Sequence, residues 1–291
     1  MTTPLISLRN IAKSFENPDG SAKIVLRDVH LEINQGEFVT IVGPSGCGKS
    51  TLLFGVAGFH KFTDGIAEFM GQPIGAPNRD RGIVFQDYTI PEYLTVEENT
   101  YFGLELQTFR FYQHFLPFQK ARLRKKHQAR VNELLQKVGL TERAHAYPRE
   151  LSGGQKQRAA IAQVLATNPK IVLMDEPFSA LDPATRESLQ ELLLKIQREN
   201  NLTILFVTHD LEEAVYLGDR IVVLSQFHGE DKPGARVILD KNLDGYDDPE
   251  IKSTPKFAQL VRDVFHIGFE PKKAIRNAEL GQHSNPQITK Q

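Results

Sequence analysis

The chain has 291 residues, 40% of them hydrophobic and 24% charged, which is enough to bury one large core or two smaller ones and excludes a disordered composition. Its 35 basic and 36 acidic residues leave a formal charge of −1, so no overall electrostatic attraction favours nucleic acid or an anionic surface. The single cysteine excludes an internal disulfide framework and a cysteine-based metal site, as is usual in a reducing compartment.

The N-terminal residues Met1–Leu5 lack the basic and apolar regions of a secretory signal. Elsewhere no apolar run approaches the roughly 20 residues that are needed to cross a bilayer. We therefore expect a cytoplasmic protein that reaches a membrane only by binding another chain.

Residues 5–42 alternate short apolar runs with turn-forming residues, which predicts an antiparallel sheet. Phe15 comes shortly before one of the turns. Its ring either packs in the core or offers a flat face to a purine base, and the pattern alone favours neither role. The last apolar run, Phe38–Val42, is typical of a buried strand.

The segment after this strand fits the phosphate-binding pattern G-x-x-x-x-G-K-[ST] at every specified position. Its residues are Gly43, Pro44, Ser45, Gly46, Cys47, Gly48, Lys49, Ser50 and Thr51. The glycines let backbone N–H groups point at a phosphate chain beside the N-terminus of a helix predicted over Ser50–Ala57. Lys49 adds a charge for the β and γ phosphates, and Ser50 offers its hydroxyl to a magnesium ion. The alternative, a glycine-rich turn without a ligand, is disfavoured because the lysine and serine follow a strand.

The position of Cys47 inside this segment has a chemical consequence. Alkylation of its thiol is expected to block nucleotide binding.

Ile66–Met70 and Arg81–Phe85 are the next predicted strands. Gln86 follows the second of them, at the edge where open α/β sheets bind ligands, although such a glutamine is more often a solvated loop residue. Thr95 and Glu98 have the spacing of a capping box and predict the start of a helix.

Residues 109–130 combine aromatic and basic side chains. The aromatic ones are Phe109, Phe111, Tyr112, Phe115 and Phe118, and the basic ones are Lys120, Arg122, Arg124, Lys125, Lys126 and Arg130. The favoured interpretation packs the aromatic rings under a helix and leaves the charges solvated. The alternative is a surface that contacts lipid headgroups or a membrane partner. Val131–Val138 then continues with helical spacing.

Ser152 and Gln155 have capping-box spacing and predict another helix start. Gly153 and Gly154 in its first turn are poor helix formers, each costing about 1 kcal/mol relative to alanine. We therefore expect a neighbour to approach this backbone closely. An exposed helix N-terminus is itself an anion site.

Ile171–Met174 is a continuous apolar run, typical of a strand buried on both faces, and Asp175 and Glu176 end it. The aspartate is expected to hold magnesium, and the glutamate to orient or deprotonate a water. Another predicted strand, Thr203–Val207, leads to His209, for which the pattern alone favours a structural role over a catalytic one.

Asp182 and Pro183 predict a capped helix start, and Ile221–Leu224 predicts the last core strand. Near the C-terminus an apolar stripe predicts one more helix. Its residues are Phe257, Leu260, Val261, Val264 and Phe265. From Glu270 the chain is polar and is expected to be mobile.

The motifs within residues 5–226, and their order along the chain, resemble those of the nucleotide-binding subunits of ATP-binding-cassette transporters. Leu151–Gln155 is similar to their signature motif and Ile171–Glu176 to their Walker B strand. Ser179–Asp182 is similar to their D-loop, His209 to their switch histidine and Gln86 to their Q-loop glutamine. The resemblance implies an α/β fold, in which a P-loop NTPase core carries an antiparallel β subdomain and an inserted all-helical subdomain. The implied parts are 1–87 and 167–226 for the ATPase core, 88–166 for the helical subdomain and 227–291 for a short C-terminal extension.

The resemblance also implies ATP and Mg²⁺ as cofactors, and two cassettes, identical or different, arranged head to tail across ATP. The residues that it assigns to nucleotide binding are Phe15, all of Gly43–Thr51, Ser152, Gly153, Gly154, Gln155 and Asp182. Those that it assigns to the metal are Ser50, Gln86 and Asp175, and those that it assigns to hydrolysis are Lys49, Gln86, Glu176 and His209. In this arrangement Phe15 stacks on adenine, Glu176 activates water and His209 contacts the γ-phosphate.

Three shorter segments, Tyr147–Glu150, Val207–Ala214 and Ser253–Phe257, resemble the nitrate, sulfonate, taurine and bicarbonate importers. Gln155 and Gln163 depart from that group, which commonly has Met and Arg there. The implied function is the ATPase of an importer of a small anion or organic acid, at the cytoplasmic face of the membrane. Its implied partners are a membrane permease and a substrate-binding protein, with no nucleic acid. The alternatives are the motor of an exporter or lipid-moving system, and a soluble ATP-driven clamp in DNA repair or translation.

Overall fold

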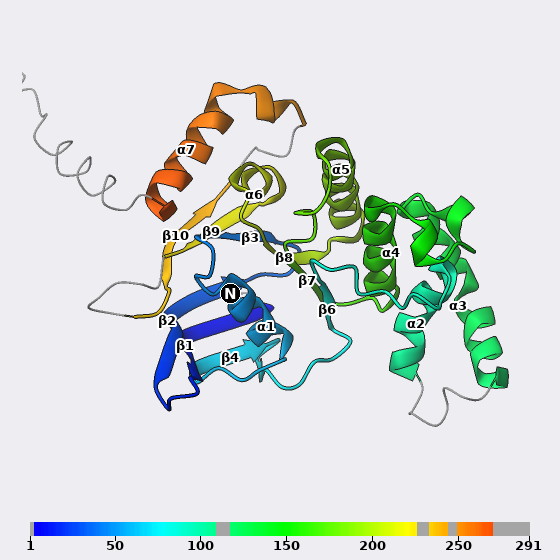
Figure 1. Cartoon of the computed structure of the whole chain (residues 1–291), viewed down its shortest axis with the longest axis horizontal. Coiled ribbons are helices and arrows are strands. Elements are labelled where there is room, and N and C mark those ends of the chain that lie inside the picture. The colour runs from blue at the N-terminus through cyan, green and yellow to red at the C-terminus, as the bar shows by residue number, and fades with distance from the viewer. Residues whose placement is uncertain (1–2, 109–116, 226–232, 244–248, 270–291) are drawn as a thin grey trace, which may run out of the picture.

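The computed structural model describes residues 3–108, 117–225, 233–243 and 249–269 (Figure 1). Phe109, Phe111, Tyr112 and Phe115 of the aromatic and basic segment lie outside the described residues, as does the polar tail from Glu270. In the described part of the chain, no helix is both long and apolar enough to cross a membrane.

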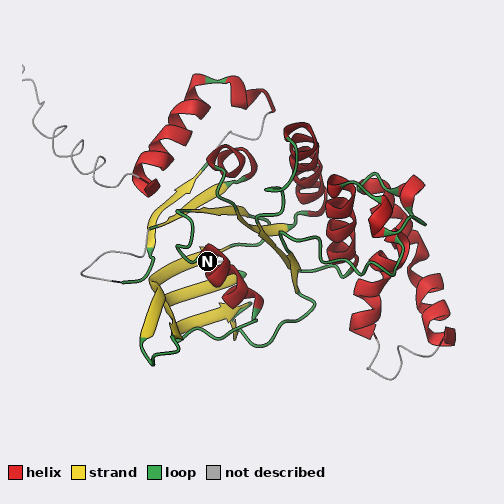
Figure 2. Ribbon diagram, viewed as in Figure 1, coloured by secondary structure: helices red, strands yellow, loops and turns green. Residues whose placement is uncertain are grey.

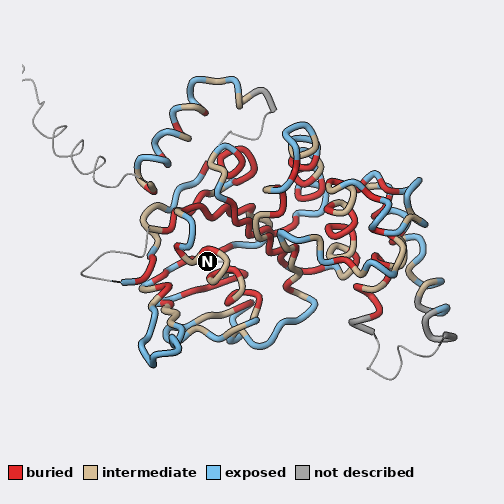
Figure 3. Tube along the Cα trace, in the orientation of Figure 1, coloured by how far each residue is buried: buried red, intermediate tan, exposed pale blue. Residues whose placement is uncertain are grey.

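A six-stranded sheet forms the centre of the molecule (Figure 2). In spatial order its strands are β10 (Val237–Asn242), β9 (Arg220–Leu224), β3 (Phe38–Val42), β8 (Thr203–Val207), β7 (Ile171–Asp175) and β6 (Arg81–Val84). All neighbours pair in parallel except β10, which runs antiparallel to β9. The strands β3 and β8 are buried along their whole length, as expected for a parallel sheet covered on both faces (Figure 3).

A second sheet of four strands lies beside the first, with the order β2 (Ala22–Ile33), β1 (Ile6–Glu16), β4 (Asp64–Phe69) and β5 (Gln72–Pro73). Its neighbours pair antiparallel, which confirms the predicted antiparallel sheet. Helix α1 (Lys49–Ala57) shares one apolar core with both sheets, in which Leu52 and Leu53 are fully buried.

The other face of the central sheet is covered by helices. These are α5 (Pro183–Asn200), α6 (Leu211–Leu217) and α7 (Pro255–Phe269), and they share a second core with α2 (Val96–Thr108), α3 (Pro117–Lys137) and α4 (Gly153–Ala166). The described residues also include the short 3₁₀ helices Thr141–Arg143, Pro148–Glu150 and Pro249–Ser253. Helices α2, α3 and α4 gather at one end of the molecule (Figure 1), and all of them fall within residues 88–166. The division of the chain into the parts given above stays a prediction.

Several predicted elements differ in extent from the observed ones. Strand β4 ends at Phe69 because Met70 has a φ of 52°, which begins a turn. The predicted helix Val131–Val138 corresponds to the C-terminal part of α3, which begins at Pro117 and ends at Lys137. Strand β10 was not predicted. The apolar stripe of α7 is confirmed except at Phe265, whose ring is 42% exposed.

Candidate functional site

The candidate site lies at one edge of the central sheet. Because β3, β6, β7 and β8 are parallel, their carboxyl ends meet there. The segment that follows β3 is the glycine-rich loop, β7 ends at Asp175, and β8 is followed by His209. Gln86 is exposed just beyond β6. The chain thus gathers at one edge four groups that lie far apart in sequence.

The glycine-rich loop wraps the start of α1. Gly48 caps the helix with a φ of 102°, and a Cβ there would lie 2.8 Å from Val25 Cγ1. A side chain would therefore meet both a strained backbone and the β2 strand, so only glycine suits the position. The result is a helix N-terminus that is free to face an anion.

Lys49 is buried beside this loop, with 6% of its surface exposed. Its Nζ donates to the carbonyl oxygens of Gly43 at 2.9 Å and Pro44 at 3.2 Å. These two carbonyls hold the ammonium close to the loop, where it can contact a phosphate. The predicted role of Lys49 is compatible with this geometry.

Cys47 is also buried, with 1% of its surface exposed, and its side chain belongs to the core between the sheets. Burial raises the pKa of its thiol, so the reactive thiolate is scarce at neutral pH. Alkylation of the folded chain therefore needs local opening, and the expectation that it blocks nucleotide binding stays a prediction.

We expect iodoacetamide to label Cys47 at least about tenfold more slowly in the native protein than in urea, because the reagent must wait for local opening. Since the native pKa is raised, the native rate should keep increasing at alkaline pH after the rate of the unfolded chain has levelled off. The measurement is mass spectrometry of quenched samples over a pH series. Equal rates in both states would contradict the burial of this thiol.

A hydroxyl and a carboxylate meet between α1 and β7. Ser50 Oγ donates to Asp175 Oδ1 at 2.8 Å. Burial raises the pKa of the Asp175 carboxyl, and the hydrogen bond from Ser50 opposes that effect. Two hard oxygen atoms beside a phosphate loop suit Mg²⁺, which is usually held by one or two protein oxygens together with phosphates and waters. The residues present therefore fit this metal.

Glu176 and His209 form the second pair, with Nδ1 of the imidazole 2.8 Å from Oε2 of the carboxylate. Glu176 has a φ of 46°, a conformation that costs energy in a residue with a side chain. Its N–H donates to Val207 O at 2.9 Å, and its carbonyl accepts from Ser179 Oγ at 3.0 Å. The backbone is thus held on both sides. The imidazole of His209 remains 56% exposed and accessible to a ligand.

Phe15 lies on β1, opposite Lys23 of β2. The residue is 43% exposed, and Lys13 Nζ lies 4.7 Å from its ring centroid. The same β2 strand supplies Val25, which contacts Gly48 of the phosphate loop. The partial exposure of Phe15 is compatible with base stacking, which stays a prediction.

Helix α4 begins with Gly153, Gly154 and Gln155, and Ser152 is its N-cap. These residues are far from the phosphate loop in sequence. The predicted capping box is confirmed, because Ser152 N donates to Gln155 Oε1 at 3.0 Å and Gln155 N donates to Ser152 Oγ at 3.3 Å. The glycines have neighbours within the chain. A Cβ on Gly154 would lie 2.3 Å from Thr185 Cγ2, and one on Gly153 would lie 2.9 Å from the Tyr88 hydroxyl. Close packing therefore explains Gly154 without a ligand.

Asp182 caps α5, as predicted, and its carboxylate accepts from Thr185 N at 3.0 Å. Arg186 links the segment Ser179–Asp182 to the turn after β8. This arginine was not predicted as a site residue. The Arg186 guanidinium donates to Leu181 O at 3.1 Å and lies 3.5 Å from Asp210 Oδ2. No sequence signal distinguishes this arginine from a solvated helix charge.

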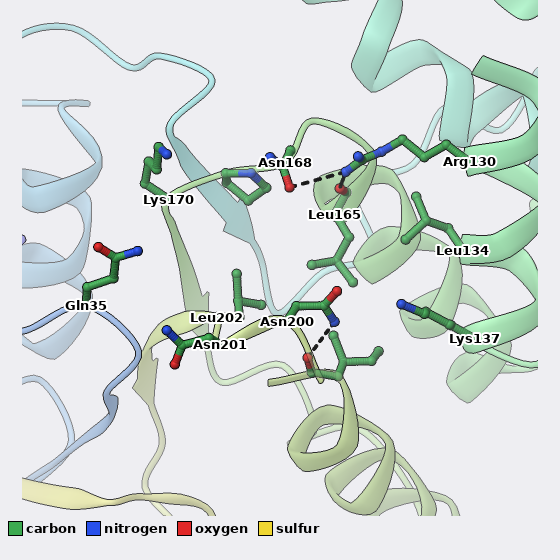
Figure 4. A pocket seen from close by; sticks show the side chains of 12 residues that line it. Gln35, Arg130, Leu134, Lys137, Leu165, Asn168, Lys170, Asn200, Asn201 and Leu202 are labelled. Atoms are coloured by element: carbon green, nitrogen blue, oxygen red, sulfur yellow. Dashed lines mark hydrogen bonds between the residues drawn. The ribbon is translucent and has the colours of Figure 1, made fainter. Parts of the chain in front are cut away.

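A cavity of about 180 Å³ lies at the opposite edge of the sheet, before β7 and β8 (Figure 4). Its polar side chains bind the C-terminal carbonyls of helices: Arg130 donates to Leu165 O at 2.9 Å, and Asn200 donates to Ile196 O at 2.7 Å. These groups complete the ends of α4 and α5. The cavity is therefore separate from the phosphate loop.

Several known proteins are similar to this chain. A family model described as ABC transporter matches residues 26–179. The taurine import ATP-binding protein TauB of Jannaschia sp. (strain CCS1) is 39% identical over 93% of this chain and 96% of its own length. The bicarbonate transport ATP-binding protein CmpC of Synechococcus elongatus is 46% identical over 82% of this chain, which spans 34% of that longer protein.

Solved structures are also similar to this chain. The dimer of the ATP-binding cassette MJ0796, in a post-hydrolysis state bound to ADP and Pi, has a TM-score of 0.66 and 33% identity. It covers 82% of this chain and 99% of its own. The α/β fold with a P-loop NTPase core is therefore confirmed.

Proposed function

Because the chain belongs to the ABC transporter family, we propose that it is the ATP-hydrolysing subunit of an importer for a small anion or organic acid. The named relatives support this cargo class, since they are described as taurine and bicarbonate transport proteins. The observation that carries the ATPase role is the pairing of Ser50 with Asp175 and of Glu176 with His209 at the end of one sheet, beside Lys49.

Each of these residues has a separate role in phosphoryl transfer. The loop N–H groups and Lys49 bind the phosphates, and Phe15 stacks on the adenine. Ser50 and Asp175 would hold Mg²⁺, which would neutralise charge on the phosphates, and Gln86 would be a further ligand. Glu176 orients the attacking water and accepts its proton, and His209 donates to the γ-phosphate. Such catalysis depends mainly on positioning.

The site is completed by a second cassette, which is identical or different in sequence. In this proposal the α4 N-terminus of one chain, Ser152–Gln155, binds the γ-phosphate held by the loop of the other, and Asp182 lies at the same interface. Two features support it: Ser152 is exposed, and the MJ0796 cassette is described as a dimer. Closure of the dimer then gates hydrolysis.

Replacing Ser152 tests this arrangement. We expect Ser152→Ala to lower ATP turnover by about tenfold, the loss of one hydrogen bond to a charged group, with unchanged ATP affinity of the monomer. Turnover is measured by phosphate release, and affinity by titration at a protein concentration below dimerisation. Ser188→Ala on α5 is the control, because Ser188 bonds Arg158 outside the site. A loss of monomer affinity would contradict the head-to-tail arrangement.

We propose that the permease docks in a groove of about 700 Å³ between β6 and the helices α2 and α4. The groove is lined by apolar residues such as Phe85, Phe102 and Val164, and Gln86 immediately follows Phe85. A partner helix in this groove would therefore lie beside the hydrolytic site. The subunit would be peripheral, on the cytoplasmic face, and a substrate-binding protein would deliver the cargo.

Purification from native membranes with a C-terminal tag tests the transport role. We expect a multi-spanning membrane protein to copurify with the parent chain and to be lost with Phe102→Asp, while ATP affinity is kept. If only soluble proteins or nucleic acid copurified, the transport role would be wrong, and the soluble-clamp alternative would replace it.

A further inference from the structure

The C-terminal part of the chain is hydrogen-bonded to the interior of the ATPase core. Lys252, in the 3₁₀ helix Pro249–Ser253, donates from Nζ to Gln190 Oε1 at 3.1 Å. Gln190 Nε2 in turn donates to Glu213 Oε1 at 3.0 Å. Because a lysine ammonium can only donate, it fixes the orientation of the Gln190 amide and turns its NH₂ group toward Glu213.

Glu213 connects this contact to the turn after β8. Its carboxylate accepts from the Thr208 hydroxyl, and its N–H donates to Asp210 Oδ1 at 3.1 Å. Thr208 Oγ1 also accepts from Asp210 N at 3.0 Å. His209 lies between these two residues, and its ring is the one paired with Glu176. The conformation of this turn therefore sets the position of the imidazole.

Burial makes the contacts of Glu213 energetically important. The side chains of Gln190 and Glu213 belong to residues that are 4% and 5% exposed. Burial raises the pKa of the Glu213 carboxyl, while the bonds from Thr208 and Gln190 lower it. If the Gln190 amide turns away, the buried Glu213 carboxylate loses a hydrogen-bond donor and must bond another group. The 208–210 turn is bonded to Glu213 through both Thr208 and Asp210, so it would move with such a rearrangement.

Lys252 is itself well placed to hold Gln190. Its Nζ lies 3.8 Å from the centroid of the buried Tyr216 ring and 3.8 Å from Glu187 Oε1. The ring and the carboxylate restrict the ammonium on two sides. Lys252 thus contacts Glu187 and Gln190 of α5 and Tyr216 of α6, and these contacts hold its side chain in one position.

We propose that Lys252 is a positioning residue for ATP hydrolysis, acting through Gln190 and Glu213 on the turn that holds His209 beside Glu176. The inference rests on the proposed function, because it assigns the lysine a part in that hydrolysis. It makes the 249–269 segment a component of the ATPase, although Lys252 touches neither the phosphate loop nor Glu176 among the contacts of the described residues.

Lys252→Met removes the donor and keeps an apolar stem against Tyr216. We expect kcat for ATP hydrolysis to fall roughly fivefold. KM for ATP should stay near the parent value, since the phosphate loop is not part of the connection. Lys252→Arg should restore kcat, because a guanidinium can donate to Gln190 and lie over the ring. Lys195→Met is the matched control, an exposed lysine of α5 paired only with Glu199 among the described residues.

A second measurement separates positioning from packing. In a His209→Ala background, Lys252→Met should cause no further loss of the residual kcat, because its effect passes through the imidazole. An unchanged kcat in Lys252→Met would overturn the inference. So would equal losses in the Met and Arg variants with a lowered melting temperature, which would indicate packing alone. A parent chain that hydrolyses no ATP would instead refute the proposed function, and the inference with it.

Discussion

Glu176→Gln is expected to lower the rate of ATP hydrolysis by about 1000-fold, the usual scale for loss of a general base. The amide is nearly the same size as the carboxylate and can still bond His209, so the site should keep its geometry. It cannot accept a proton from water. ATP affinity should therefore stay close to that of the parent, because Lys49 and the loop N–H groups are unchanged.

The trapped state gives this prediction its second readout. A chain that binds ATP but does not cleave it should accumulate as an ATP-bound dimer, visible by light scattering with Mg²⁺ present. Glu191→Gln, an exposed residue of α5, is the control and should turn over normally. Parental turnover in Glu176→Gln would refute the assigned role. Lost affinity would indicate instead that the strained backbone at this residue supports the nucleotide site.

The strands and the motifs that follow them could be predicted because each signal is local. A strand that is buried in a parallel sheet is often a continuous apolar run, and β7 and β8 each contain one of four residues. Since the ligands of such a sheet bind at the carboxyl ends, Asp175 and Glu176 could be assigned to the site from the sequence. Local pattern was sufficient for these residues.

Contacts between distant segments could not be predicted in the same way. The Glu176 to His209 pair depends on the β7–β8 register and on a φ of 46° at Glu176, and neither has a pattern in sequence. Gly154 shows the same limit. Its need for a close neighbour was predicted, but the neighbour is Thr185 of the same chain. The burial of Cys47 likewise follows from the contact between the two sheets, far from its own motif.

Lys49→Ala is expected to weaken ATP binding by about 100-fold, because a charge-assisted contact with the phosphates is lost. Two carbonyl oxygens, of Gly43 and Pro44, also lose their donor, but water can reach them once the side chain is removed. Fluorescent nucleotide titration measures the affinity, and a melting curve without nucleotide measures the loop. Lys241→Ala on β10 is the control. Affinity within about twofold of the parent would contradict the assignment.

The two substitutions separate binding from cleavage when they are combined. Glu176→Gln alone should trap the dimer, since ATP binds and stays intact. Adding Lys49→Ala removes the binding step, so the trapped dimer should disappear at ATP concentrations that saturate the single variant. If the double variant still formed the dimer, association would not require the phosphate contact of Lys49. Dimer formation would then depend on contacts between the two cassettes and not on the ATP bound between them.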